Sequence, residues 1–590
     1  MALFDQKKAN ELFYKNYQET KCFAEAIRHV DEQFHAIVIN EAEPIELFPP
    51  KDLHTAVGGK LCRCRGMIQD ISLEPILYKG TPELFYTGEA GSEKNSTFVD
   101  VVFYYVIPVP CNAHFYRTSE TAGAAIPEDG APCPSERRRP RSDEKAIAEA
   151  NHPNEAITQR AAGFCSEAQR AMKNNMVHPV DPMQTHEQYL NLPYPATSKA
   201  LCTACIIMVP IRRDTCKCVI NINDVVDFYG FLHLLDDQTD PSVLEEDEFA
   251  QFSSWHAAEL SKGLVSRLFC VSYRHLNETP SVQRRLSQGG LTFSQHRDMS
   301  KRYLEREICG GDSLLAEYLL LHLCTKVSGH HEMTPIGDVP LLVTSKNIEP
   351  HVWSERISKI TPVAEVFLDE KLLCSSVHSL GPVYDYVKNY IKTGLFQVAN
   401  GSHITVDCTH IRNSTSNEEK PRPWDDLLFD LVHKQRLSID YQYRTVPIFV
   451  NLAFLALSAS DTDAVYSIFN FPLRFKWEPH TTSSFTLSDA AASDSEAAIV
   501  REYFTRAHQL SPSFSDDNNV QDKLVETMIN LSVSFPKWNN HDALVHNNIF
   551  SVATALFRAQ ALSMGREAVN EEDIEFVNNL EKKRMERHVD

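Results

Sequence analysis

The sequence predicts a multidomain α+β protein with a helical N-terminus, a β-rich domain, an α/β domain and a helical C-terminus. Three observations favour this fold class. Apolar residues recur every three or four positions near both ends of the chain, which indicates amphipathic helices. Alternating and β-branched runs fill much of residues 56–280, as expected for strands. Helical and strand patterns then alternate between residues 300 and 480, which is typical of a parallel sheet.

Length and composition restrict the class of protein. The chain has 590 residues, 43% of them hydrophobic, which suits roughly three or four globular domains. Its formal net charge of −21 argues against broad binding to nucleic-acid phosphates and suits basic protein partners. We find no apolar run long enough to cross a membrane and no secretory pattern at Met1–Lys8. We therefore expect a cytosolic or nuclear protein whose 15 cysteines are reduced.

Residues 1–55 form the predicted N-terminal helical segment. Residues 5–36 are predicted to be one helix because apolar side chains, from Leu12 to Phe34, recur at helical spacing with charges between them. Such an apolar stripe either packs on the rest of the protein or docks a partner.

Residues 56–117 and 196–280 are predicted to form the β domain. Strand patterns cover 61–68, 97–107, 201–211, 216–220, 225–235 and 264–273. Together these runs provide about the five strands that an OB barrel needs. We therefore expect an OB-like β-barrel domain.

The run Leu61–Ile68 alternates strictly. Cys62 and Cys64 are expected on one face of a strand, and Arg63 and Arg65 on the other. The two arginines are the main support for an alternative function, in which the barrel binds single-stranded DNA. Few aromatic residues accompany them, so direct nucleic-acid binding is not the favoured interpretation.

Residues 118–195 interrupt the β domain and are predicted to be disordered. This insertion is rich in Ala, Pro and Glu and poor in aromatic residues, so it cannot bury enough apolar surface to fold alone. It contains a basic run formed by Arg137, Arg138, Arg139 and Arg141. The run is either a solvated charge cluster or a nuclear-import signal.

Residues 300–480 are predicted to form the α/β domain, followed by helices over 496–590. The expected helices and strands, in chain order, lie at 312–327, 339–343, 351–360, 363–368, 403–407 and 446–456. A buried leucine-rich helix, a Gly-Asp turn and a strand that ends in a loop are typical of the start of an AAA-type nucleotide-binding core. Near the C-terminus, Gly565 is expected to end one helix and Asn570 to cap the next.

ATP is the first ligand that such a core suggests. A P-loop needs glycines so that backbone amides surround the phosphates, a Lys for the outer phosphates, and a Ser or Thr for magnesium. The first predicted strand is followed by Thr344, Ser345 and Lys346, without a glycine. Asp407 stands where a magnesium-binding Asp is expected, but Cys408 occupies the position of the water-activating Glu. We expect a degenerate nucleotide site, with a divergent ATPase as an alternative.

A hydrolase is the second enzymatic alternative. Gly311–Leu314 spells the Gly-Asp-Ser-Leu signature of GDSL esterases, and Asp407 and His410 match their Asp-x-x-His. That nucleophile normally follows a buried strand, whereas charged, helix-like residues precede the signature here. Helix capping by Asp312 or Ser313 explains the signature without catalysis.

Zinc is the remaining candidate ligand. Cys202, Cys205, Cys216 and Cys218 provide four thiols at a spacing that suits zinc. Both pairs lie in apolar stretches, where Cys behaves as a small hydrophobic residue. We therefore expect buried thiols, with neither a metal nor a cofactor.

Several short motifs follow one another along residues 35–460. They are Arg65–Asp70, Tyr104–Pro110, Asn223-Asp224 with Phe228–Gly230, and Gly311–Leu323 with Pro335–Gly337. The ordered set resembles the MCM-binding proteins, which are non-catalytic partners of the MCM replicative helicase. The C-terminal run Val569–Ile574 resembles the helical lid of MCM subunits themselves.

The resemblance implies a degenerate MCM relative, in which an OB-like domain precedes a non-catalytic AAA-like domain with a C-terminal helical lid. It implies a nuclear adaptor or chaperone that binds MCM helicase subunits during assembly or unloading of the complex in DNA replication. An MCM-like body without a P-loop can occupy a subunit position in the ring without driving it. The chain departs from its relatives at Cys408, where they carry Glu, and this further weakens the case for nucleotide hydrolysis.

Overall fold

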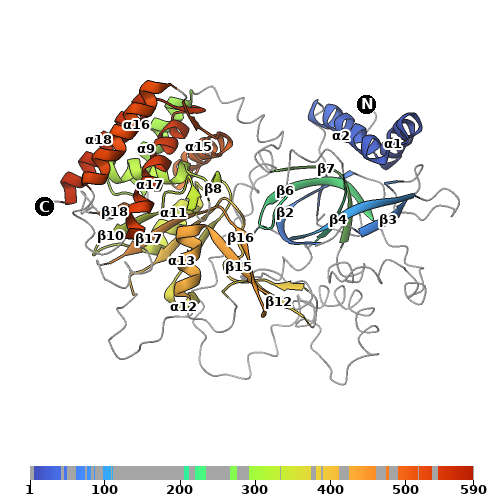
Figure 1. Ribbon diagram of the computed structural model, residues 1–590, viewed down its shortest axis with the longest axis horizontal. Coiled ribbons are helices and arrows are strands. Elements are labelled where there is room, and N and C mark those ends of the chain that lie inside the picture. Colours follow the sequence, from blue (N-terminus) through green and yellow to red (C-terminus); the bar gives the residue numbers. More distant parts are fainter. Residues whose placement is uncertain are drawn as a thin grey trace, which may run out of the picture.

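A β-barrel and an open parallel sheet form the two halves of the molecule, and helices cover both (Figure 1). In the computed structural model, the described residues are 5–40, 46–48, 61–72, 76–80, 85–86, 97–107, 109, 205–211, 220–233, 266–275, 292–331, 334–373, 380–386, 390–410, 424–459, 473–477, 490–515, 517–534 and 543–588. The architecture is mixed α/β with several sheets, as the sequence predicts. None of the helices in this described part combines the length and the apolar character that a membrane span needs.

Two helices, not one, form the N-terminal segment: α1 (Gln6–Thr20) and α2 (Phe23–Asn40). The prediction of one helix over 5–36 is wrong because the chain turns at Lys21, which has a left-handed φ of 55° and donates its N–H to the Tyr17 carbonyl at 2.8 Å. A lysine gives no turn signal, so the helical pattern continues through the break. The turn lets both apolar stripes pack with the barrel in one buried cluster.

Five strands close into the barrel: β2 (Leu61–Ile71), β4 (Thr97–Ile107), β5 (Cys205–Pro210), β6 (Val225–His233) and β7 (Ser266–His275). They pair in the order β2-β6-β7-β5-β4 and return to β2. Strands β5 and β7 are parallel, and every other pair in the ring is antiparallel. Strands β1 (Glu46–Phe48) and β3 (Ile76–Gly80) add to β2 and β4. Ring closure gives each of the five strands two partners and removes open edges.

Most predicted strands of this region are confirmed, with ends that differ by a few residues. The predicted strand at 216–220 lies outside the described residues except for Ile220, which is not in a strand. The predicted insertion at 118–195 also lies outside the described residues.

The second half of the molecule is built on a parallel sheet of β10 (Leu341–Thr344), β11 (Glu365–Leu368), β14 (Ser402–Asp407), β17 (Leu452–Ser458) and β18 (Leu473–Lys476). The spatial order is β11-β14-β17-β10-β18, and all neighbours are parallel. The strands are largely buried, as expected for a parallel sheet covered on both faces, and β11 and β14 also bury polar side chains such as Glu365 and His403. The first strand in sequence, β10, therefore lies between the last two.

A four-stranded sheet was not predicted by the sequence. It consists of β12 (Val383–Asp385), β13 (Tyr390–Lys392), β15 (Arg436–Asp440) and β16 (Thr445–Phe449), and it lies beside the barrel in Figure 1. The predicted single strand at 446–456 is wrong, because the chain leaves β16 at Val450 and enters β17 of the parallel sheet. The apolar run continues through this change of sheet, so the pattern does not reveal it.

Helices surround the parallel sheet. Those near the start of this half are α9 (Phe293–Glu307), α10 (Ser313–Cys324) and α11 (Pro350–Ser358), followed by the short α12 (Glu370–Leu373) and α13 (Asp425–Lys434). The C-terminal helices are α15 (Ala490–Gln509), α16 (Asn518–Ser534), α17 (Ala543–Ser563) and α18 (Glu571–His588). Short pairings join β8 (Gly329–His331) to β9 (Thr334–Ile336), and β19 (Ser513–Phe514) to β20 (Ala568–Val569).

Helix α10 is buried along most of its length, as predicted, and it packs against α9, α15 and α17. The predicted helix end and cap near the C-terminus are confirmed. Gly565 follows α17 with a left-handed φ of 73°, and the Asn570 side chain accepts the Asp573 N–H at 3.0 Å. Tyr318 and Asp312 of the α10 region bond to Glu581 and Arg587 of α18, so the last helix is tied to the buried one.

Candidate functional site at the carboxyl edge of the parallel sheet

The carboxyl edge of the parallel sheet is the place where a nucleotide site is expected. Ligands of open α/β sheets bind outside the carboxyl ends of the strands, where the strand order reverses, and β10 is that position here. The Ser345 N–H donates to the Ser458 carbonyl at 3.0 Å, and the Cys408 N–H to the Leu457 carbonyl at 2.8 Å. The structure therefore brings the predicted residues after β10 and β14 to one edge, with the end of β17 between them.

The loop from β10 to α11 does not form a phosphate cradle. Thr344 is buried, and its hydroxyl donates to the Phe475 carbonyl of the neighbouring strand β18 at 3.2 Å. This hydroxyl is therefore engaged within the sheet. Lys346 is exposed. Glu349 stands at the N-cap of α11 without a side-chain capping bond, and Pro350 follows as its first residue. A proline has no N–H to offer, and a carboxylate at this helix end repels a phosphate.

The residues after β14 are engaged locally. One carboxylate oxygen of Asp407 accepts the Thr409 N–H at 2.9 Å and its hydroxyl at 2.5 Å. Cys408 is fully buried, and its burial, followed by the nearby Asp407 charge, holds the pKa of the thiol well above its usual range. A neutral, buried thiol cannot replace the carboxylate that activates water in an ATPase.

The Gly-Asp-Ser-Leu signature forms a helix cap. The Asp312 side chain accepts the Leu315 N–H at 3.0 Å at the start of α10. The same carboxylate binds the Arg587 guanidinium at 2.7 Å and 3.1 Å, and it is almost completely buried. Ser313 is exposed beside it, whereas Asp407 is the last residue of β14 and His410 follows that strand. Both oxygens of the Asp312 carboxylate are therefore engaged in the helix cap and in the contact with Arg587, as the capping interpretation predicts.

Of the four predicted zinc-spacing cysteines, only Cys205 is described. It is buried near Cys64 and Cys62, and burial followed by the contact with Cys64 raises the pKa of its thiol well above normal. No group of three or more His, Cys, Asp or Glu residues within the described ranges is arranged to hold a metal ion. Cys202, Cys216 and Cys218 lie outside those ranges, as does the predicted import signal at Arg137, Arg138, Arg139 and Arg141.

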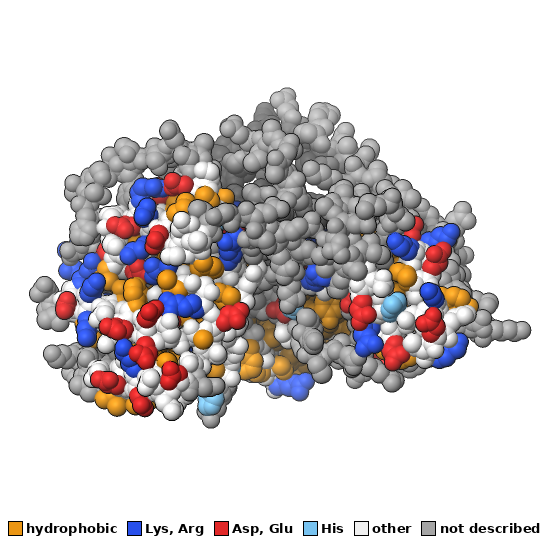
Figure 2. Space-filling model, turned by 90° about the horizontal axis from the view of Figure 1, so that it is seen from above, with side chains coloured by type: hydrophobic (Ala, Val, Ile, Leu, Met, Phe, Trp, Pro, Cys, Tyr) orange, Lys and Arg blue, Asp and Glu red, His pale blue; other side chains and the backbone are white. Residues whose placement is uncertain are grey.

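The arginines of β2 alternate with its cysteines, as predicted. Arg65 pairs across the sheet with Asp227 of β6, and its guanidinium donates two hydrogen bonds at 2.6 Å and 2.8 Å. The two side chains are 8% and 0% exposed, so this positive charge is neutralised inside the protein. Figure 2 shows acidic and basic side chains interspersed on the described part of the face seen from above. These observations weaken the single-stranded DNA alternative.

A buried polar network at the opposite edge of the sheet was missed by the sequence. The His322 Nδ1 lies 2.6 Å from the Val339 carbonyl, and its Nε2 lies 3.0 Å from the Nε2 of His403. The His403 Nδ1 lies 2.5 Å from a carboxylate oxygen of Glu365. Burial, followed by His403, lowers the pKa of His322 to about 3, so this ring is neutral. Its Nδ1 therefore carries the proton for Val339, and the His403 Nε2 donates to His322.

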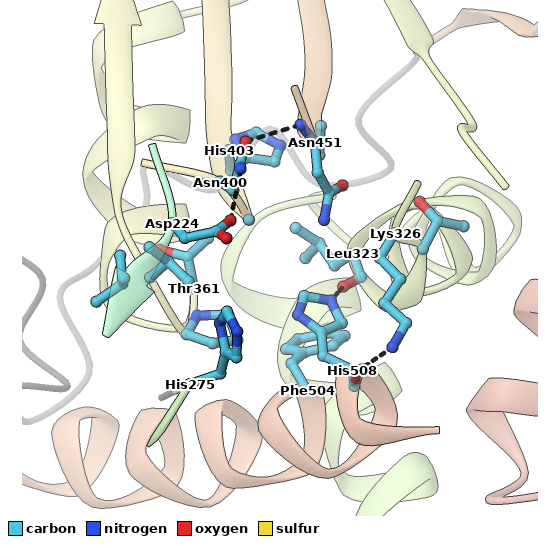
Figure 3. Close-up of a pocket in the computed structure, with 16 residues that line it drawn as sticks. Asp224, His275, Leu323, Lys326, Thr361, Asn400, His403, Asn451, Phe504 and His508 are labelled. Carbon is cyan, nitrogen blue, oxygen red and sulfur yellow. Dashed lines mark hydrogen bonds between the residues drawn. The ribbon is translucent and has the colours of Figure 1, made fainter. Parts of the chain in front are cut away.

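A cavity of about 170 Å³ lies next to this network (Figure 3). The barrel contributes Asp224 and His275 to its wall, the sheet contributes His403 and Ala453, and α15 contributes His508. No pattern in the sequence indicates this cavity, because its walls come from three distant parts of the chain.

Comparison with known families identifies the chain. A family model described as mini-chromosome maintenance replisome factor matches residues 40–588. The chain belongs to this family. The match includes the barrel strands, the parallel sheet and the C-terminal helices, so the family pattern extends over both halves of the molecule.

Members of the mini-chromosome maintenance replisome factor family with similar sequences are named mini-chromosome maintenance complex-binding proteins. The Drosophila melanogaster protein is 25% identical over 396 residues, which is 65% of this chain and 63% of that protein. The Arabidopsis thaliana protein is 27% identical over 291 residues, which is 48% of each. The Salmo salar protein is 24% identical over 362 residues, or 57% of this chain and 56% of that protein. The chain thus spans about half to two-thirds of the length of these relatives.

Proposed function

We propose that this protein binds MCM helicase subunits as a non-catalytic adaptor or chaperone and acts in the assembly or unloading of the MCM complex during DNA replication. Family membership and the names of the relatives support MCM binding. The observation that carries the non-catalytic part is the loop after β10. It has no glycine, and it leads to Glu349 and Pro350 at the start of α11.

We further propose that the barrel is OB-like and that the second half is AAA-like with a helical lid. A closed ring of five strands, with β5 and β7 parallel, supports the first assignment. The five-stranded parallel sheet, with β10 between β17 and β18, supports the second. The tie between α10 and α18 supports a lid that is held on the core.

Mimicry is the physical reason for this proposal. In this proposal, a body shaped like an MCM subunit meets the surfaces that subunits present to each other. The nucleotide edge lacks the groups that bind and activate ATP, so such a body does not contribute to the ATPase cycle. It therefore keeps free subunits soluble or takes the place of one subunit and opens the ring.

Two measurements test the proposal. In pull-downs of the purified chain with each MCM subunit separately, we expect at least one subunit to be retained. Binding of ATP, measured with and without magnesium, is expected to be undetectable in the same preparation. Failure to retain any subunit would reject the partner, and magnesium-dependent ATP turnover by the chain alone would reject the non-catalytic role.

We also propose that the protein acts in the nucleus. The basic run at Arg137–Arg141 supports this by its composition.

A further inference from the structure

The cavity of about 170 Å³ lies where three parts of the molecule meet (Figure 3). On the barrel side, the cavity is lined by residues at the start of β6 and at the end of β7. The parallel sheet presents its amino edge, and α15 closes the remaining side.

Among the described residues, one polar group in the wall lacks a hydrogen-bond partner, and one half-buried cation lacks a counter-ion. Thr361 is 4% exposed, and its hydroxyl has no hydrogen-bond partner among the described residues. Lys326 follows α10 and donates to the His508 carbonyl at 2.7 Å. Within the described ranges, no carboxylate forms an ion pair with its ammonium group, and burial lowers the pKa of this lysine. Buried donors and buried cations normally have partners, so a missing acceptor is indicated.

Further donors face the same space. The side-chain oxygen of Asn451 accepts the Val327 N–H at 2.9 Å, which leaves its amide nitrogen directed into the cavity (Figure 3). The His508 Nε2 bonds to the Leu323 carbonyl at 2.9 Å, and burial lowers the pKa of this ring to about 4. The ring is therefore neutral at physiological pH.

The carboxylate of Asp224 in the cavity wall already accepts hydrogen bonds through both of its oxygens. The Asp224 carboxylate accepts the Asn400 amide at 2.9 Å through one oxygen and the Asn221 N–H at 2.8 Å through the other. This carboxylate belongs to the barrel side, and it is not an ion-pair partner of Lys326. The sheet and helix sides of the cavity therefore offer hydrogen-bond donors and one positive charge.

We propose that this cavity binds a small oxyanion, such as phosphate or a short carboxylate, through Lys326, Thr361 and Asn451. The volume equals that of roughly five or six water molecules, which is enough for an anion of this size and a few waters. Nucleotides are excluded by size, since pockets for ligands of that kind measure about 300 Å³ or more. A charge-assisted hydrogen bond from a partly buried ammonium group provides the affinity.

The anion would act at the junction of the barrel, the sheet and α15. Because all three proposed ligands belong to the α/β half, the bound anion stabilises this half by mass action. This role does not depend on the proposed MCM partner, and the two proposals fail separately.

Isothermal titration of the full chain with inorganic phosphate, and separately with acetate, tests the proposal. We expect saturable binding of at least one anion at one site. Lys326→Gln is expected to weaken it roughly 10- to 100-fold, since it removes a charged donor. Lys582→Gln, which removes an exposed lysine of α18, is the matched control and should leave the affinity unchanged. The circular dichroism spectrum of each variant checks that it is folded.

Thr361→Val provides a second test that does not change charge. It is expected to weaken the anion several-fold, roughly fivefold, while Thr361→Ser retains the affinity. The proposal is overturned if the wild-type chain binds neither anion. It is equally overturned if Lys326→Gln and Thr361→Val bind as tightly as the wild type, because the anion then lies elsewhere.

Discussion

Removal of Arg65 from the barrel is predicted to be strongly destabilising. Arg65 and Asp227 face each other on β2 and β6, joined by two hydrogen bonds, and both are nearly inaccessible to solvent. Arg65→Met removes both of these hydrogen bonds, and the positive charge that makes them, from the buried Asp227 carboxylate, which costs about 3–5 kcal/mol. A loss of this size lowers the melting temperature of the unfolding unit by roughly 6–20 °C.

Differential scanning calorimetry of the full chain measures this effect. The transition whose midpoint shifts in the Arg65 variant is assigned to the barrel. The double variant Arg65→Met/Asp227→Leu is the control, because it leaves no orphaned charge and should recover most of the loss. If Arg65 instead served single-stranded DNA, the single variant would lose DNA affinity and keep its melting temperature. An unchanged melting temperature would refute the reasoning.

The other predictions concern acid stability, the last helix and localisation. In the folded protein, His322 and His508 have pKa values of about 3 and 4, whereas unfolded histidine has a pKa of about 6.5. The unfolded state therefore binds more protons between these values. As a result, the free energy of unfolding decreases as the pH falls from about 6.5 to about 4. His508→Gln should flatten that loss in urea melts recorded against pH, and an equally steep loss would contradict it. Asp312→Ala removes both the cap of α10 and the hydrogen-bond partner of Arg587 in α18. The variant should lose about 1–3 kcal/mol of stability and show faster amide exchange in α18. Unchanged exchange would argue that the Asp312–Arg587 contact does not hold α18 on α10. Alanine at all four arginines of the run 137–141 should move a fluorescent fusion from the nucleus to the cytoplasm, and an unchanged nuclear signal would exclude this import signal.

The local features of the fold were predictable where one pattern decides the element. Helix α10 is marked by a cap residue followed by an apolar run, and β10 and β14 are short apolar runs that end in polar loops. The absence of glycine after β10 is equally visible in the sequence, so the lack of a glycine-rich phosphate loop there was predictable.

Features that depend on tertiary packing were not predictable. Lys21 adopts a left-handed conformation that favours glycine or asparagine, and the pattern gives no sign of it. The hydrogen bonds that join Glu365, His403 and His322 connect residues far apart in the chain, each embedded in an apolar stretch. Only His322 gave a signal, as a polar residue inside an otherwise buried helix. The order of the sheets likewise depends on long-range pairing that periodicity does not encode.

Co-elution of the purified chain with individual MCM subunits is the most direct test of the central claim. Size-exclusion chromatography with mass detection reports the stoichiometry of each complex, and ATP turnover is measured on the same fractions. The account predicts a stable complex with at least one subunit and no turnover in fractions of the chain alone. Absence of every complex, together with turnover that Asp407→Ala abolishes, would contradict it and mean that the carboxyl edge of the parallel sheet is a working active site.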